Sequence, residues 1–172
     1  MNNYRTWGRA PFATAVIHGG PGAAGEMAAV AHELSRSRGV IEPFQTEMTV
    51  SGQVTELKKV LNDQGDLPVT LLGHSWGAIL SFIVTAKNPA MVKKLILVSS
   101  GVFDNAYAAG ITRARLHRLS QKDREVLETL ATKLNGPKNR DKNRIFAEFG
   151  KVIETADTWD PLLHTIEGVD YR

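Results

Sequence analysis

A serine stands between two glycines in the segment Gly73-His74-Ser75-Trp76-Gly77, the G-x-S-x-G pattern in which a serine hydroxyl acts as a nucleophile. This pattern forms a sharp turn from a strand into a helix, and only very small residues fit beside the strained serine. Residues 68–72 are a short apolar run, and residues 78–86 form an apolar stretch of helical length. Ser75 is therefore predicted at a helix N-terminus, where free N–H groups favour negative charge. An ordinary strand–helix turn is the alternative interpretation.

A second glycine-rich segment, His18-Gly19-Gly20-Pro21-Gly22, follows the apolar run at residues 13–17. A strand that ends in such a loop leaves backbone N–H groups able to face a developing oxyanion. A plain tight turn would use the same residue types. Because a predicted nucleophile follows farther along the chain, we favour the oxyanion loop. The two segments together indicate acyl transfer by Ser75.

The pair of segments resembles the α/β-hydrolases, and is similar in particular to the proline iminopeptidase branch over residues 10–103. The resemblance implies an α/β-hydrolase fold, with a mostly parallel sheet flanked by helices and a helical cap. It also implies Ser75 as the nucleophile and the N–H groups of Gly20 and Trp76 as the oxyanion hole, with no cofactor and no metal. Residues 44–51 depart from the iminopeptidase pattern. Esterase, amidase, aminopeptidase and lactonase activities therefore stay open.

Strands and helices are predicted to alternate along residues 1–103, which we interpret as the N-terminal part of the hydrolase core. The predicted strands are 13–17, 39–43, 68–73 and 94–98, and the predicted helices are 23–37, 52–64 and 76–87. This alternation indicates a parallel sheet covered on both faces.

Residues 104–172 change character and are interpreted as a helical cap segment that lies over Ser75. Ser120 is expected to cap a helix that ends at Asn135-Gly136-Pro137. The leucines expected near one face of this helix are Leu116, Leu119, Leu127, Leu130 and Leu134. A second helix is expected at 139–156, with Phe146 among its buried residues.

The base and the acid that would complete the site are not evident from the sequence. His164 follows Ser75 in the expected order, but a cap or loop position is the favoured interpretation. His18 is expected to brace the oxyanion loop, and His74 to point away from the nucleophile. Asp104 follows the strand at 94–98 but lies several residues too far along the loop. The other residues considered were His32, His117, Asp157, Asp160 and Asp170, none of them in a convincing position.

The strand at 94–98 is expected to form an uncovered edge of the sheet. A complete fold of this type would continue with two more strand–helix units, which deliver the acid and then the histidine. We therefore expect the C-terminal strands to be missing and the chain to be the N-terminal two-thirds of a hydrolase. The exposed edge predicts pairing with another chain or with a C-terminal fragment.

The composition limits the possible functions. Of the 172 residues, 42% are hydrophobic and 23% are charged, which is typical of a globular domain. There is no cysteine, which excludes a disulfide and a thiol nucleophile. A cytoplasmic protein without a membrane partner is predicted, because no apolar run reaches about 18 residues. The net charge of +3 is too small to indicate a nucleic-acid partner. The basic stretch 113–144 is interpreted as a solvated face of the cap helices, with a nucleic-acid or other anionic partner as the alternative.

The predicted function is that of a serine hydrolase that cleaves an ester or amide bond of a small substrate through an acyl-enzyme. A catalytically incomplete hydrolase-like fragment, or a binding module, is the alternative.

Overall fold

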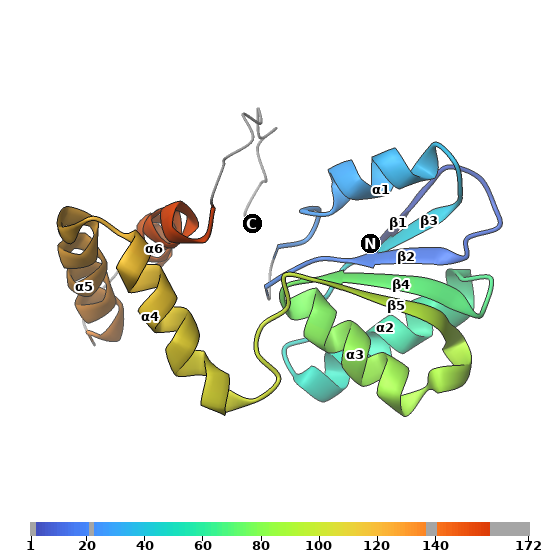
Figure 1. Cartoon of the computed structure of the whole chain (residues 1–172). Helices are drawn as coiled ribbons and strands as arrows, with labels where there is room; N and C mark the ends of the chain where they lie inside the picture. Colours follow the sequence, from blue (N-terminus) through green and yellow to red (C-terminus); the bar gives the residue numbers. More distant parts are fainter. Residues whose placement is uncertain (1–2, 21–22, 137–140, 159–172) are drawn as a thin grey trace. The chain divides into compact units, whose positions relative to one another are not determined.

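The computed structural model describes residues 3–20, 23–136 and 141–158, and these residues divide into two compact units. The described residues up to Phe103 hold the strands and the helices α1–α3 (Figure 1). Those from Asp104 onward hold α4, α5 and α6. No helix in the described part is long and apolar enough to cross a membrane.

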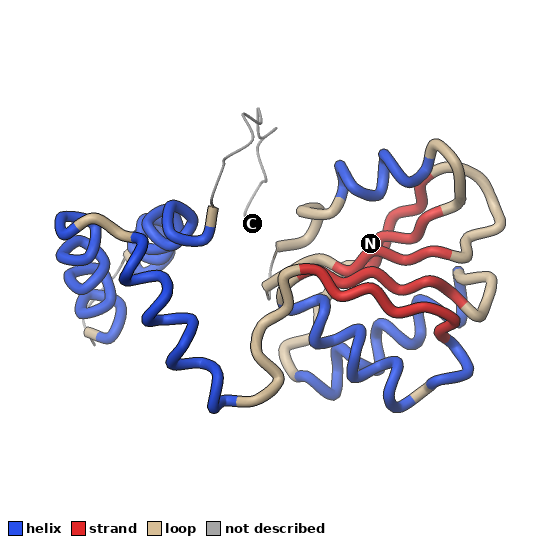
Figure 2. Tube along the Cα trace, viewed as in Figure 1, coloured by secondary structure: helices blue, strands red, loops and turns tan. Residues whose placement is uncertain are grey.

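The strands of the first unit form one mostly parallel sheet. In chain order they are β1 (Tyr4–Trp7), β2 (Thr14–Ile17), β3 (Val40–Pro43), β4 (Val69–His74) and β5 (Val92–Val98). Their order in the sheet is β1-β3-β2-β4-β5 (Figure 2). Only the pair β1–β3 is antiparallel, and the pairs β2–β3, β2–β4 and β4–β5 are parallel. Parallel neighbours need crossover connections, and the helices supply them.

The three crossover helices cover both faces of the sheet. Helix α1 (Ala28–Ser35) lies on one face, and α2 (Val50–Gln64) and α3 (Trp76–Lys87) lie on the other (Figure 1). Successive strand residues point to opposite faces, and β2 shows this clearly. Ile17 packs in a core cluster with Leu61 of α2 and Leu80 of α3. Val16 packs in a second cluster with Ala31 of α1. The predicted parallel sheet with helices on both faces is confirmed.

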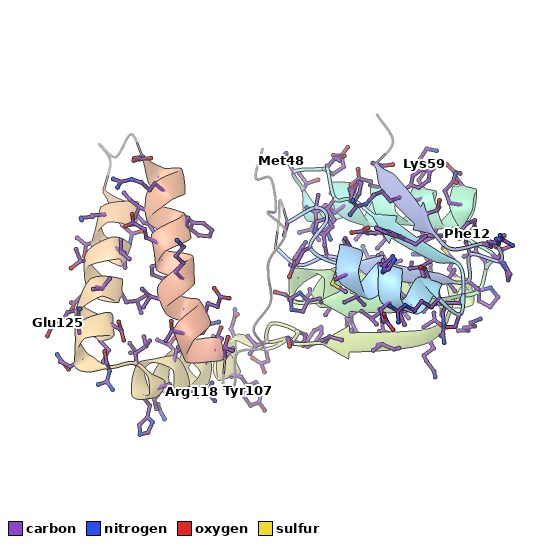
Figure 3. All side chains as sticks on the ribbon, turned by 90° about the horizontal axis from the view of Figure 1, so that it is seen from above. Phe12, Met48, Lys59, Tyr107, Arg118 and Glu125 are labelled. Atoms are coloured by element: carbon purple, nitrogen blue, oxygen red, sulfur yellow. The ribbon has the colours of Figure 1, made fainter. Side chains whose placement is uncertain are left out.

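The second unit consists of α4 (Ala108–Arg118), α5 (Gln121–Asn135) and α6 (Lys142–Asp157). Figure 3 marks Arg118 at the end of α4 and Glu125 on α5. Ser120 caps α5 as predicted, since its Oγ accepts a hydrogen bond from the N–H of Asp123 at 3.1 Å.

Three details of the sequence prediction for this unit are wrong. Leu116 belongs to the separate helix α4, and Leu119 is buried at the C-terminal end of that helix rather than on α5. The phenyl group of Phe146 is 67% exposed, although its neighbour Ile145 is buried. The helical repeat explains this, because consecutive residues point about 100° apart and only one of the two can face α5.

Strand β1 was not predicted, and a buried carboxylate holds it on the sheet. Glu42 of β3 is fully buried and stands directly opposite Arg5 of β1. The guanidinium donates Nε–H to Oε2 and Nη2–H to Oε1, both at 3.0 Å, and Trp7 Nε1–H donates to Oε2 at 2.9 Å. Removal of one partner of such a pair leaves a buried charge uncompensated.

We predict that Arg5→Ala lowers the free energy of unfolding by about 3 kcal/mol, because it leaves the Glu42 carboxylate without its counter-charge. Urea unfolding followed by tryptophan fluorescence measures the change. The matched control is Arg36→Ala, which removes an exposed pair with Glu33 and should cost about 0.5 kcal/mol or less. Equal losses for the two variants would contradict a structural role for the buried pair.

Within the described residues the sheet ends at β5, as expected, and the C-terminal part of this edge strand, after the exposed Lys93 and Lys94, is apolar. Strand β4 is its one neighbour there. The side chains of Ile96, Leu97 and Val98 are 37%, 40% and 40% exposed. An exposed apolar edge strand is a template for pairing with another strand. Pairing through β5 therefore remains our proposal for a partner.

We predict that Leu97→Lys reduces self-association of the chain, because a charged side chain disfavours pairing at an edge strand. Light scattering over a range of protein concentrations measures the effect. Val50→Lys is the control, since Val50 is also an exposed apolar residue but lies on α2. A parent chain that is monomeric at every concentration would count against edge pairing.

Candidate active site

The predicted nucleophile stands at a strained turn between β4 and α3. Ser75 has φ 52° and ψ −117°, a conformation that costs free energy in a residue with a side chain. Its N–H donates to the carbonyl of Val98 at 3.0 Å, and its carbonyl accepts from the N–H of Ala78 at 3.1 Å. These bonds hold the turn to β5 on one side and to the start of α3 on the other.

Two glycines permit this turn because backbone lies against both of them. A Cβ on Gly73 would lie 2.3 Å from the carbonyl oxygen of Gly77. A Cβ on Gly77 would lie 2.4 Å from the carbonyl oxygens of both Ile17 and His18. No other residue type fits at either position unless the backbone moves. The requirement for glycine on either side of the serine, inferred from the sequence, therefore has a steric cause here.

The fold brings the two glycine-rich segments together at the carboxyl edge of the sheet. The predicted oxyanion loop, which begins at His18, follows β2, and β2 is paired with β4. A Cβ on Gly19 would lie 3.0 Å from the Cβ of Ser75. Gly20, the next residue, has φ +38°, where glycine is favoured. Trp76 is the first residue of α3, so its N–H has no acceptor within the helix. Pro21 and Gly22 lie outside the described residues.

His18 braces the loop and is fully buried. Its Nε2 accepts a hydrogen bond from the N–H of Gln45 at 3.1 Å, and its Nδ1 lies 2.9 Å from the carbonyl oxygen of Gly19. A backbone N–H can only donate and a carbonyl can only accept, so these contacts select the neutral tautomer with hydrogen on Nδ1. Both ring nitrogens are therefore engaged, and His18 is not available as a base for Ser75.

Helix α2 holds the segment that carries Gln45. The carboxylate of Glu56 accepts from the N–H of Thr46 at 2.9 Å and from Asn3 Nδ2 at 3.0 Å. Partial burial raises the pKa of Glu56, but these hydrogen bonds, the Thr46 hydroxyl and the N–H of Glu47 outweigh it and lower that pKa below its ordinary value. The carboxylate thus stays ionised as the anchor of this segment.

Gln53 of α2 connects the same segment to the residue after the nucleophile. This side chain is buried. Its Nε2 donates to the carbonyl of Glu47 at 2.9 Å, and its Oε1 accepts from Trp76 Nε1 at 2.8 Å. The indole is therefore oriented by α2.

Glu26 is a residue of the site that the sequence analysis missed. It lies in the turn before α1, and its Oε2 accepts a hydrogen bond from the N–H of Gly19 at 3.1 Å. Its Oε1 lies 2.9 Å from Nδ1 of His74. No spacing in the sequence signals this role. The contacts arise only when the fold brings the loop that begins at His18 against the turn at residues 73–77, which we call the elbow.

The described residues place no imidazole in a hydrogen bond with Ser75. His18 and His74 have the contacts given above, and the His32 ring meets the Trp7 ring edge-on at 5.9 Å. His117 lies on α4 in the second unit. His164 falls outside the described residues, so the structure does not test the predicted cap or loop position of this histidine.

The candidate acids have other contacts or lie outside the described residues. Asp104 accepts from the N–H of Ala106 at 2.9 Å. Asp157 accepts from Arg115 Nε at 2.8 Å and from Nη2 at 2.6 Å, and these hydrogen bonds lower the pKa of Asp157. Asp160 and Asp170 fall outside the described part.

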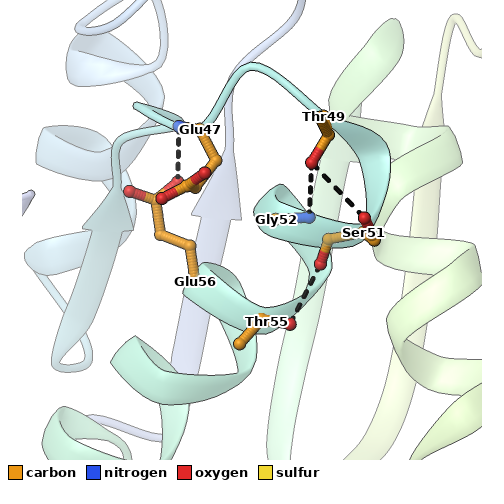
Figure 4. Close-up of a pocket in the computed structure, with 6 residues that line it drawn as sticks. All are labelled: Glu47, Thr49, Ser51, Gly52, Thr55 and Glu56. Carbon is orange, nitrogen blue, oxygen red and sulfur yellow. Dashed lines mark hydrogen bonds between the residues drawn. The ribbon is translucent and has the colours of Figure 1, made fainter.

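A shallow hollow of about 350 Å³ lies beside the N-terminus of α2 (Figure 4). Thr49 caps this helix by accepting from the N–H of Gly52 at 3.0 Å. Ser75 does not line the hollow, whose polar groups largely bond to one another. Among the described residues no cluster of three acidic or histidine side chains could hold a metal ion. The residues that line the hollow are Glu47, Thr49, Ser51, Gly52, Thr55 and Glu56.

Residues 16–150 match the family described as alpha/beta hydrolase fold. The chain belongs to this family. The matched region includes both glycine-rich segments and Glu26. Membership confirms the resemblance at the level of the superfamily, and the iminopeptidase branch stays a prediction.

Two solved structures show the same fold. VinJ is 21% identical with a TM-score of 0.67, and the match covers 84% of this chain and 54% of VinJ. Proline iminopeptidase from Mycobacterium smegmatis is 24% identical with a TM-score of 0.59, covering 86% of this chain and 56% of that one. Lipase LipV from Mycobacterium tuberculosis is 33% identical over 60 residues, which are 35% of this chain and 23% of the lipase. This alpha/beta hydrolase chain thus matches little more than half the length of VinJ and of the iminopeptidase.

We predict that Gly73→Ala lowers the free energy of unfolding by about 3 kcal/mol or more, since the methyl group meets backbone that cannot rotate away. Chemical unfolding measures the loss. Gly101→Ala is the control in the same unit, because its methyl group would meet only the movable end of the Ile79 side chain, at 3.2 Å. If both variants are as stable as the parent chain, the close approach at the elbow is not a constraint.

Proposed function

We propose that this protein is a serine hydrolase that uses Ser75 to cleave an ester or amide bond of a small substrate. The observation that carries the proposal is the strained serine at the start of α3, with the glycine loop against it. Strain of this kind in a residue other than glycine is concentrated at functional sites. The relatives named as a lipase and a proline iminopeptidase support hydrolysis.

In the proposed reaction Ser75 Oγ attacks the carbonyl carbon of the substrate and loses its proton to a general base. The N–H groups of Gly20 and Trp76 donate to the oxyanion of the tetrahedral intermediate. Gly19 is not a donor, because its N–H is bonded to Glu26. The bond to the leaving group then breaks, the leaving group takes up the proton, and an acyl-enzyme remains. Water attacks the acyl group and restores the free serine.

The general base and its carboxylate partner are proposed to come from outside the described residues. His18 is excluded as the general base because both of its ring nitrogens are already in hydrogen bonds. His164 stays a candidate. We also retain residues 104–172 as a proposed helical cap and a cytoplasmic location as a prediction.

A binding module with the hydrolase fold is the second candidate function. It is favoured by one observation, the lack of an imidazole hydrogen-bonded to Ser75 in the part of the chain that the structure describes. A serine without a base reacts slowly with electrophiles. The reactivity of Ser75 therefore separates the two functions.

We predict that a fluorophosphonate adds once to the chain and that Ser75→Ala abolishes the adduct. Intact mass spectrometry before and after treatment measures it. Ser99→Ala is the matched control, because Ser99 also has a positive φ, 45°, and follows the neighbouring strand β5. It should label like the parent chain. A parent chain that gains no adduct overturns the proposal that this chain is an active hydrolase, and the incomplete fragment or the binding module takes its place.

A further inference from the structure

One carboxylate contacts both segments of the candidate active site. Glu26 accepts from the N–H of Gly19 at 3.1 Å, and its other oxygen lies 2.9 Å from His74 Nδ1. Gly19 immediately precedes the proposed oxyanion donor Gly20, and His74 immediately precedes the proposed nucleophile Ser75. A single side chain thus joins the neighbours of the two reacting groups.

We propose that Glu26 is a positioning residue, which sets the separation between the oxyanion loop and the nucleophile by bridging Gly19 and His74. This inference rests on the proposed function, because it gives Glu26 a part in the reaction of Ser75. Glu26 does not itself contact the reacting atoms. It acts through the two residues that it holds.

The packing around Gly19 shows how closely the bridge is coupled to the nucleophile. A Cβ at this glycine would lie 3.0 Å from Ser75 Cβ, 3.1 Å from Glu26 Oε2 and 3.2 Å from His74 Nδ1. The side chains of Ser75, Glu26 and His74 therefore all lie close to Gly19. A displacement of the carboxylate displaces the loop relative to Ser75.

Glu26 completes a two-sided attachment of the loop. On the side of β3, Gln45 holds His18 through the imidazole and also donates Nε2–H to the His18 carbonyl at 2.9 Å. On the side of α1, Glu26 holds Gly19. Gly20 then follows with φ +38°, and a Cβ there would meet nothing within 4 Å. No neighbour stands where a side chain at Gly20 would begin, and the hydrogen bonds at His18 and Gly19 are the attachments that hold the described part of the loop.

The bond to Gly19 carries more of this role than the contact with His74. A carboxylate that accepts from a backbone N–H forms a charge-assisted hydrogen bond, which is stronger than a neutral one. His74 Nδ1 is at ion-pair distance but lacks hydrogen-bond geometry, and it attracts the carboxylate only when the imidazole is protonated. The essential feature is therefore an oxygen that accepts from the Gly19 N–H, and a glutamine side chain also provides one, as a neutral and weaker acceptor.

Three variants of the full chain test the proposal. Glu26→Ala removes the acceptor, Glu26→Gln keeps an oxygen that can accept from Gly19, and Glu33→Ala removes an exposed acid of α1 as the control. The first readout is the rate of fluorophosphonate addition to Ser75. The second is hydrogen exchange of the Gly19 amide by NMR, which does not depend on activity.

We expect Glu26→Ala to label about 10- to 100-fold more slowly, because small misplacements of catalytic groups have effects of this size. Exchange of the Gly19 amide should become about tenfold faster, since its hydrogen bond is lost. Glu26→Gln should stay within about threefold of the parent chain in both readouts, because its oxygen restores the bond. Glu33→Ala should match the parent chain.

The outcomes that overturn the two proposals differ. If Ser75 is labelled in the parent chain and equally fast in Glu26→Ala, the positioning role is wrong and the hydrolase proposal stands. If Ser75 is not labelled in the parent chain, the hydrolase proposal fails and the positioning role fails with it. If Glu26→Ala does not fold, Glu26→Met replaces it as a variant of similar size that lacks the acceptor. Labelling and Gly19 amide exchange that both match the parent chain in Glu26→Met overturn the positioning role.

Discussion

The site depends on a contact between backbones at the end of the sheet, where neither Gly73 nor Gly77 could carry a side chain. Because atoms of the main chain form this contact, no rotamer change could relieve an added methyl group. The start of α3 is thereby fixed against β4 and against the end of β2. The strained φ of Ser75, the position of the Trp76 N–H at the first residue of α3 and the short distance from Ser75 to Gly19 all follow from that placement.

Polar side chains behind the site form hydrogen bonds that fix the geometry of the loop. Helix α2 contributes two of them, since Glu56 holds the segment after β3 and Gln53 holds both that segment and Trp76. The segment in turn supplies Gln45 to the buried His18. Buried polar groups are stabilising when each has its partner, and both polar side-chain atoms of the buried His18 and of the buried Gln53 have one. The site thus rests on a set of hydrogen bonds that extends to helix α2.

Much of the first unit could be predicted from the sequence, because periodic apolar residues and glycine turns act locally. Strands β2 to β5, the crossover helices and the sharp turn at Ser75 were found in this way. Strand β1 was missed, since its pairing depends on the contact of Arg5 with Glu42, 37 residues away. Glu26 was missed for the same reason, as its partners meet only in the folded chain. Phe146 was placed wrongly because an apolar residue beside a buried one can still face solvent.

The hydrogen bond between Trp76 and Gln53 links residues 23 positions apart in the sequence. The side chain beside the nucleophile thus takes its orientation from another helix, although it belongs to the recognised pentapeptide. Two proteins with the same five residues around the serine would present different surfaces to a substrate if they differed at the position of Gln53. Selectivity in such proteins would then diverge through α2, and a comparison of the nucleophile segments alone would not register the difference.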